Sequence, residues 1–120
     1  MDELRKLVEC GEECLGTGTR NTAEFKSFAR KFNNRLKKQF SSIGGRDYKG
    51  SVGHFYISGF VDVQGETYYF SISDVRNGFG ANTDILVRTA KDRKDFTGGA
   101  NHFIPMDNNF AENFKRTFNL

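Results

Sequence analysis

The chain has 120 residues, a common length for one domain, and its composition is rich in Phe (13) and Gly (13), with one Pro and no Trp. A chain of this length can bury a core without metal or disulfide staples, and many glycines with little proline favour tight turns over a disordered tail. No apolar run approaches the ~20 residues of a transmembrane helix, and the start Asp2-Glu3 lacks the apolar core of a signal peptide. These features predict one cytoplasmic domain spanning residues 1–120.

Charge is unevenly distributed along the chain, although the net charge is only +3. Residues 1–20 carry three basic and five acidic groups, and residues 51–120 carry seven basic and eight acidic groups. Residues 21–50 carry eight basic and two acidic groups, a net charge of +6. A positive excess confined to one segment favours a surface that meets phosphates or acidic partners.

A helix is predicted over residues 2–15, because apolar residues recur at helical spacing: Leu4, Leu7, Val8 and Leu15. Its first turn is acidic, as the helix dipole favours. Glycines at 16 and 18 then form a linker, so residues 1–20 are an N-terminal extension to a core of residues 21–120. The extension holds both cysteines, Cys10 and Cys14. In a helix their Cα atoms would lie about 6 Å apart with poorly aimed Cβ atoms, which predicts free thiols in a reducing compartment.

Residues 22–40 predict the longest helix, with a stripe of six apolar residues: Phe25, Phe28, Ala29, Phe32, Leu36 and Phe40. Asn21 and Glu24 resemble a capping box at its start. The opposite face carries six cations: Lys26, Arg30, Lys31, Arg35, Lys37 and Lys38. This face either meets phosphates or keeps a Phe-rich helix in solution, and no aromatic residue interleaves with its cations.

The second half of the chain alternates in the way that antiparallel strands do. Strands are predicted over residues 53–63, 66–75 and 83–90, followed by a short edge segment over residues 102–106. A closing helix is predicted over residues 108–118, and Asn109 with Glu112 resembles a capping pair at its start. Gln64-Gly65 predicts a two-residue hairpin turn. The order α-α-β-β-β-(β)-α predicts an α+β fold, a three- to four-stranded antiparallel meander packed against N-terminal and C-terminal helices.

One parity of these strands places aromatic and polar residues on the same face of the sheet: Tyr56, Ser58, Phe60, Tyr69, Ser71, Ser73 and Arg88. If that face is open, it is an aromatic platform for a base or a protein partner. If the N-terminal helix covers it, it is the other half of the core.

The segment from Arg88 to His102 is the densest polar run of the chain. It carries Lys91, Arg93 and Lys94 close to the pair Gly98-Gly99, whose backbone amides could approach an anion. It lacks the strand-to-helix context of a phosphate-binding P-loop, so a charged connecting loop is the alternative interpretation.

Catalysis has little support in the sequence. A metal-independent ribonuclease could use His54 and His102, which both begin predicted strands. The cysteines have no zinc-type partners, and no base can be assigned to activate a nucleophile. We therefore expect no metal, no cofactor and no enzyme.

Two stretches, Tyr69–Arg76 and Ile85–Asn101, resemble short proteins encoded on bacterial plasmids, conjugative elements and phages. The resemblance implies an inhibitor of host defence, including CRISPR nucleases, or an accessory that handles nucleic acid. The element order also resembles that of double-stranded-RNA-binding domains. The lysine cluster that opens the last helix of such domains is replaced here by Asp107, Asn108 and Asn109.

The prediction from the sequence is a non-catalytic binding protein of a bacterial mobile element that inhibits a nucleic-acid-handling defence complex of the anti-CRISPR type. Its partner would be a protein or a protein–nucleic-acid complex, with no membrane. Direct nucleic-acid binding through residues 22–40 is the first alternative, and the ribonuclease is the second. The predicted contact residues are Lys26, Arg30, Lys37, Lys38, Tyr56, Tyr69, Arg88, Arg93 and Lys94.

Overall fold

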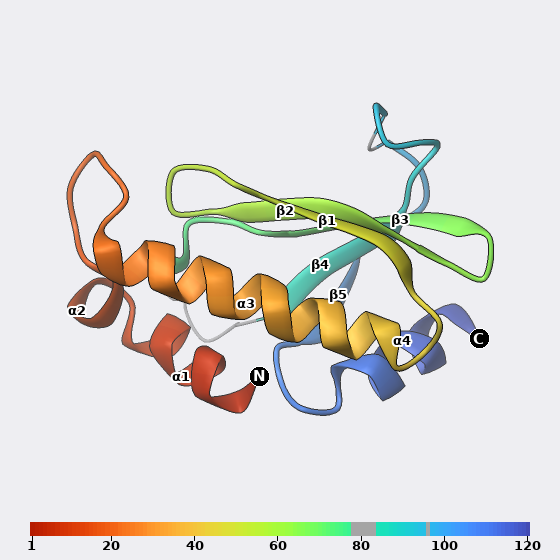
Figure 1. Ribbon diagram of the computed structural model, residues 1–120, viewed down its shortest axis with the longest axis horizontal. Coiled ribbons are helices and arrows are strands. Elements are labelled where there is room, and N and C mark those ends of the chain that lie inside the picture. The colour runs from red at the N-terminus through yellow and green to blue at the C-terminus, as the bar shows by residue number, and fades with distance from the viewer. Residues whose placement is uncertain (78–83, 96) are drawn as a thin grey trace.

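The computed structural model describes residues 1–77, 84–95 and 97–120, which form a sheet with helices along one of its faces (Figure 1). The sheet is antiparallel, and its strand order follows the chain, β1-β2-β3-β4-β5. The strands are β1 (Arg46–Val52), β2 (Ile57–Val63), β3 (Glu66–Ile72), β4 (Asp84–Thr89) and β5 (His102–Pro105). The helices are α1 (Asp2–Cys10), α2 (Glu12–Leu15), α3 (Ala23–Ser41) and α4 (Phe110–Phe118), with a 3-10 turn η1 at Val75–Asn77. None of the helices in these ranges is long and apolar enough to cross a membrane.

The predicted α+β class is confirmed, but the predicted strand count of three to four is wrong because the sheet has five strands. The missed strand is β1, whose sequence RDYKGSV contains two apolar residues and no alternation. It is an edge strand and exposed at six of its seven positions. Its register to β2 shifts between Arg46 and Lys49, where Asp47 has a φ of 52°. The residue at position 83, placed in a strand by the sequence, lies outside the described residues.

The Phe stripe of α3 packs on the inner face of the sheet, where the alternation of β2, β3 and β4 predicts buried side chains. Phe40 stands at the centre of this core, with ring centroids 6.2 Å from Phe70 and 5.1 Å from Phe114 of α4. Tyr48 of β1 stacks on Phe70 at 5.2 Å and donates a hydrogen bond to Asn33 Oδ1 at 2.6 Å. Burial raises the pKa of the Tyr48 phenol far above its ordinary value, so the hydroxyl remains a donor.

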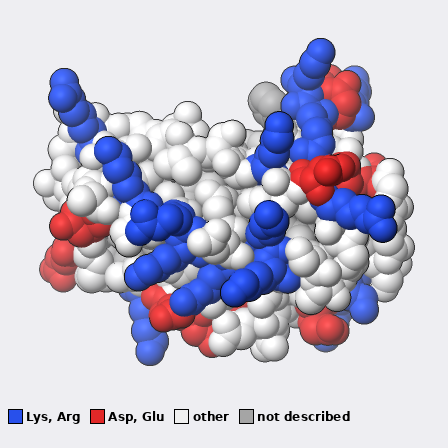
Figure 2. All heavy atoms as spheres, viewed as in Figure 1, with Lys and Arg blue, Asp and Glu red and all other residues white. Residues whose placement is uncertain are grey.

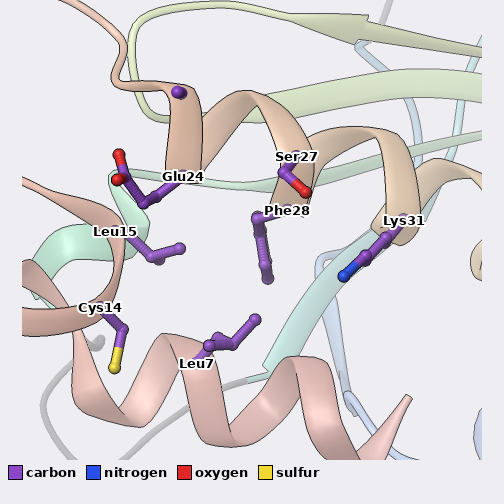
Figure 3. A pocket seen from close by; sticks show the side chains of 8 residues that line it. Leu7, Cys14, Leu15, Glu24, Ser27, Phe28 and Lys31 are labelled. Atoms are coloured by element: carbon purple, nitrogen blue, oxygen red, sulfur yellow. The ribbon is translucent and has the colours of Figure 1, made fainter.

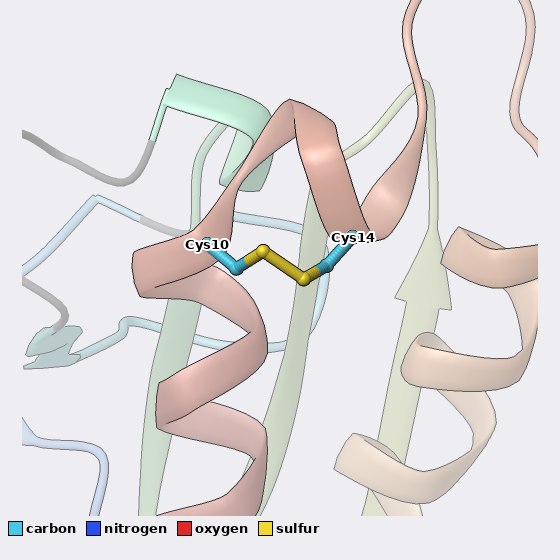
Figure 4. The surroundings of a disulfide bond; sticks show 2 residues. All are labelled: Cys10 and Cys14. Atoms are coloured by element: carbon cyan, nitrogen blue, oxygen red, sulfur yellow. A yellow bond between two sulfur atoms is a disulfide. The ribbon is translucent and has the colours of Figure 1, made fainter.

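The predicted single helix over residues 2–15 is divided at Gly11, which has a φ of 65°. A Cβ at Gly11 would overlap the carbonyl of Arg76, so the break also permits close packing on η1. The Cα atoms of Cys10 and Cys14 lie 5.6 Å apart across the break and the two cysteines form a disulfide (Figure 4). The prediction of free thiols is therefore wrong, because it assumed an unbroken helix.

The start of α3 also differs from the predicted capping box. Thr22 is the N-cap, and its hydroxyl accepts a hydrogen bond from Phe25 N at 3.1 Å. Asn21 instead bridges to the β1–β2 connection, donating to Gly53 O at 2.8 Å and accepting from Phe55 N at 2.9 Å. These bonds fix the beginning of α3 against the end of the sheet where the β1–β2 connection lies.

The start of α4 lacks the predicted capping pair as well. Asn109 occupies the N-cap position without a side-chain capping bond. Gln39 of α3 supplies the acceptor instead, since its Oε1 accepts from Ala111 N at 3.0 Å. This bond joins α3 to α4 under the sheet.

Candidate functional site

The outer face of the sheet carries no helix of the described chain, because α1, α3 and α4 all lie on the inner face (Figure 1). The N-terminal helix, which could have covered it, packs against α3 and η1 instead. The parity predicted for the outer side chains is confirmed by the burial pattern of β2 and β3. Two outer aromatic side chains are strongly exposed, Tyr56 at 47% and Phe103 at 57%.

A row of aromatic and basic side chains crosses this face at one level of the sheet. Lys49 pairs with Phe60, Phe60 with Tyr69, and Tyr69 with Arg88. The Phe60 and Tyr69 ring centroids lie 5.5 Å apart, and the Arg88 guanidinium carbon lies 5.0 Å from the Tyr69 centroid. We call these four residues the cross-strand row. Sequence reasoning missed Lys49, because its place on the outer face depends on the unpredicted strand β1.

A basic strip on α3 borders the row at the β1 edge. Asn33 touches β1, since a Cβ at Gly50 would overlap its side-chain amide. Arg30 and Lys37 lie one helical turn before and after Asn33, and Lys26 lies on the same side of the helix. All three are exposed, and Figure 2 shows Lys and Arg side chains gathered along α3.

The remaining cations of α3 lie outside the strip, toward α1. Lys38 and Lys31 lie about a third of a turn away from the strip, on the side of α1, and Arg35 pairs with Glu3 of α1. The acidic residue of α3, Glu24, also lies on that side, where it lines a pocket with Leu7 of α1 (Figure 3). The strip toward β1 is therefore purely basic, whereas the α1 side mixes both signs.

The β4–β5 connection rises on the outer side of the sheet (Figure 1). Arg93 donates to Asp47 O at 2.6 Å and pairs with Asp62 at 3.3 Å, so it ties this loop to β1 and β2. Lys94 is exposed, and Asp92 accepts from its backbone N–H at 2.7 Å. A hydrogen bond from Thr97 lowers the pKa of Asp95 in the same loop. Of the two predicted loop contacts, Lys94 points to solvent and Arg93 has a structural partner.

The structure does not bring the two histidines together. His54 lines a pocket on the outer face, near the start of β2. His102 pairs with Val87 in β5 and its ring lies 4.9 Å from that of Phe118 of α4, on the inner face. The ribonuclease alternative thus loses the shared site that it requires. Among the residues described, no group of three or more His, Cys, Asp or Glu side chains could hold a metal ion.

Comparisons of the chain with protein-family models, with curated proteins and with solved structures find no match.

Proposed function

We propose that this chain is a non-catalytic binding protein that holds single-stranded nucleic acid across the open face of its sheet. The observation that carries the proposal is the cross-strand row, in which Lys49 and Arg88 flank the paired rings of Phe60 and Tyr69. Proteins bind unpaired strands with aromatic rings that stack on bases and with cations that follow the phosphates. The row supplies both, and it supplies the aromatic component that α3 lacks.

The α3 strip extends the proposed site along the β1 edge. Lys26, Arg30 and Lys37 border the edge on which Lys49 lies, so phosphates can follow the edge while bases lie over the sheet. A duplex keeps its bases stacked inside, where sheet aromatics cannot reach them. The start of α4 also offers Asp107 and not a lysine cluster, which argues against the clamp of a double-stranded-RNA-binding domain.

The test is a fluorescence-anisotropy titration with labelled single strands and the matching duplex at ~50 and ~200 mM salt. Single strands should bind more tightly than the duplex. If Lys26, Arg30, Lys37 and Lys49 each contact one phosphate, the slope of log K against log salt should be about −3. Lys49→Gln, Arg30→Gln and Lys37→Gln should each reduce that slope by about 0.7, and the exposed α1 cation Lys6, changed to Gln, should not. If all four variants gave the same slope of log K against log salt, the proposal would be wrong.

The stacking component is tested by Tyr69→Leu against Tyr69→Phe. Leucine keeps apolar bulk and removes the ring, so it should weaken single-strand binding by ~1–3 kcal/mol, whereas Phe should retain most of the affinity. An inhibitor of a host defence complex, the prediction drawn from the mobile-element resemblance, is the rival. It would show no binding to free nucleic acid and a requirement for one specific protein.

A further inference from the structure

Next to the cross-strand row the outer face opens into a pocket of about 260 Å³, lined by serine hydroxyls as well as by tyrosine rings. We propose that this pocket binds one ribonucleotide unit of an RNA strand, with the base against tyrosine and the ribose hydroxyls on serine and aspartate. The inference rests on the proposed function and deepens it, because it names RNA as the preferred strand. The lining residues are His54, Tyr56, Ser58, Tyr69, Ser71, Ile72, Ser73 and Asp74.

Two tyrosines form the walls of the pocket. Tyr69 is flanked by the Phe60 ring and by the Arg88 guanidinium, and these contacts fix the orientation of its ring beside the pocket. Tyr56 lies over Gly53, where a Cβ would overlap its ring. The pocket volume falls just below the ~300–1,000 Å³ of pockets for drug-sized ligands, which suits a single nucleoside.

Serine hydroxyls line the pocket between these walls. Ser58 and Ser71 are direct cross-strand partners on β2 and β3, and Ser73 follows on the same parity. Each hydroxyl both donates and accepts hydrogen bonds, as the ribose hydroxyls do. Three such groups converging beside two tyrosines suit a sugar better than they suit an apolar ligand or a phosphate.

Asp74 adds a fixed anionic acceptor at the rim. Its Oδ1 accepts from Arg76 N at 3.1 Å and Nε at 2.9 Å, and its Oδ2 accepts from Nη2 at 2.6 Å. A carboxylate has about four lone-pair positions, so Oδ2 can still accept one more donor. A carboxylate repels phosphate and accepts from hydroxyls, and the 2′-hydroxyl is the group that distinguishes RNA from DNA.

The test compares an RNA strand, its 2′-O-methyl form and the DNA strand of the same sequence, bound by the full chain. RNA should bind about tenfold more tightly than either of the other two, the worth of one well-placed hydrogen bond. Ser71→Ala and Asp74→Asn should each bring this ratio close to one. Ser51→Ala is the matched control. Ser51 lies on β1, where it pairs with Ser58 of β2, but it does not line the pocket, so its change should leave the ratio unchanged.

Equal binding of RNA and DNA by the unaltered protein would overturn the inference and leave the proposed single-strand function intact. A Ser71→Ala variant that weakens RNA and DNA by the same factor would also overturn it, because the hydroxyl would then lack a sugar-specific partner. Absence of binding to every strand would instead reject the proposed function itself.

Discussion

The two faces of the sheet are both rich in aromatic residues, yet they are used in opposite ways. On the inner face the rings of Phe70 and Tyr68 are buried against the helices, where Phe40 and Phe114 contact them. On the outer face Phe60 and Tyr69 lie between cations and next to serines, with no described helix above them. The comparison teaches that the neighbours of a ring, more than the number of rings, separate a core from an open face of the sheet.

The largest expected effect lies on the inner face. Phe40→Ala removes a fully buried ring that contacts both the sheet and α4, so the free energy of unfolding should fall by about 3–5 kcal/mol. Denaturant unfolding followed by circular dichroism measures the loss. At temperatures where the variant is folded, its affinity for single strands should match that of the unaltered protein.

Phe60→Ala is the matched change on the outer face. The ring of Phe60 is only partly buried, so its removal should cost about 1 kcal/mol of stability or less while it weakens strand binding. If Phe60→Ala were as destabilising as Phe40→Ala, the outer face would be a second core and the distinction between the faces would fail.

At the disulfide in the helical layer the expected loss of stability lies between those of Phe40→Ala and Phe60→Ala. The Cys10–Cys14 bridge closes a loop of only a few residues, so its reduction should lower the free energy of unfolding by about 2 kcal/mol. Unfolding curves with and without a dithiol reductant measure this, and a Cys10→Ser/Cys14→Ser variant should not respond to the reductant. Because the bridge lies away from the outer face, strand affinity should stay constant; a change in affinity would show that the faces are coupled.

The smallest effect on stability is expected at the rim of the outer face, and it should disappear in acid. The hydrogen bonds from Arg76 lower the pKa of Asp74 from 3.8. A carboxyl with a lowered pKa stabilises the fold above its unfolded value, and this contribution disappears as the pH falls through the folded value. The melting-temperature difference between the unaltered protein and Asp74→Asn should therefore be present at neutral pH and disappear as the pH falls through the lowered pKa of Asp74. A difference that persists in acid would mean that packing, and not charge, holds this corner.

The inner half of the fold could be predicted from the sequence, because burial leaves a periodic signal. The α3 stripe and the alternation of β2 and β3 were both visible, as was the Gln64-Gly65 turn, in which both residues have positive φ. Strand β1 left no such signal, since an edge strand with one partner and little burial needs no apolar parity. Its backbone bonds to β2 define it, and these are not encoded in side-chain pattern.

Most members of the candidate site could be predicted, but Lys49 and the arrangement of the site could not. The sequence placed Tyr56, Tyr69 and Arg88 on one face, yet the row depends on the register that brings Lys49 beside Phe60. Gly11, where the helix breaks between the two cysteines, has a positive φ and lies against the carbonyl of Arg76 from a distant segment. Long-range contacts of this kind lie beyond local periodicity.

The order of the strands also bears on how the protein reaches this structure. Each strand pairs with its neighbour along the chain, so the sheet can grow by short loop closures, one hairpin at a time. The C-terminal segment makes its contacts over long sequence separations, since Asn108 Oδ1 accepts from the Met1 amine at 2.9 Å and Ala111 N donates to Gln39 Oε1 at 3.0 Å. We therefore expect the β2–β3 hairpin to form early and α4 to dock late. In stopped-flow experiments, substitutions at Phe114 should then mainly accelerate unfolding, whereas changes at the Gln64-Gly65 turn should slow refolding.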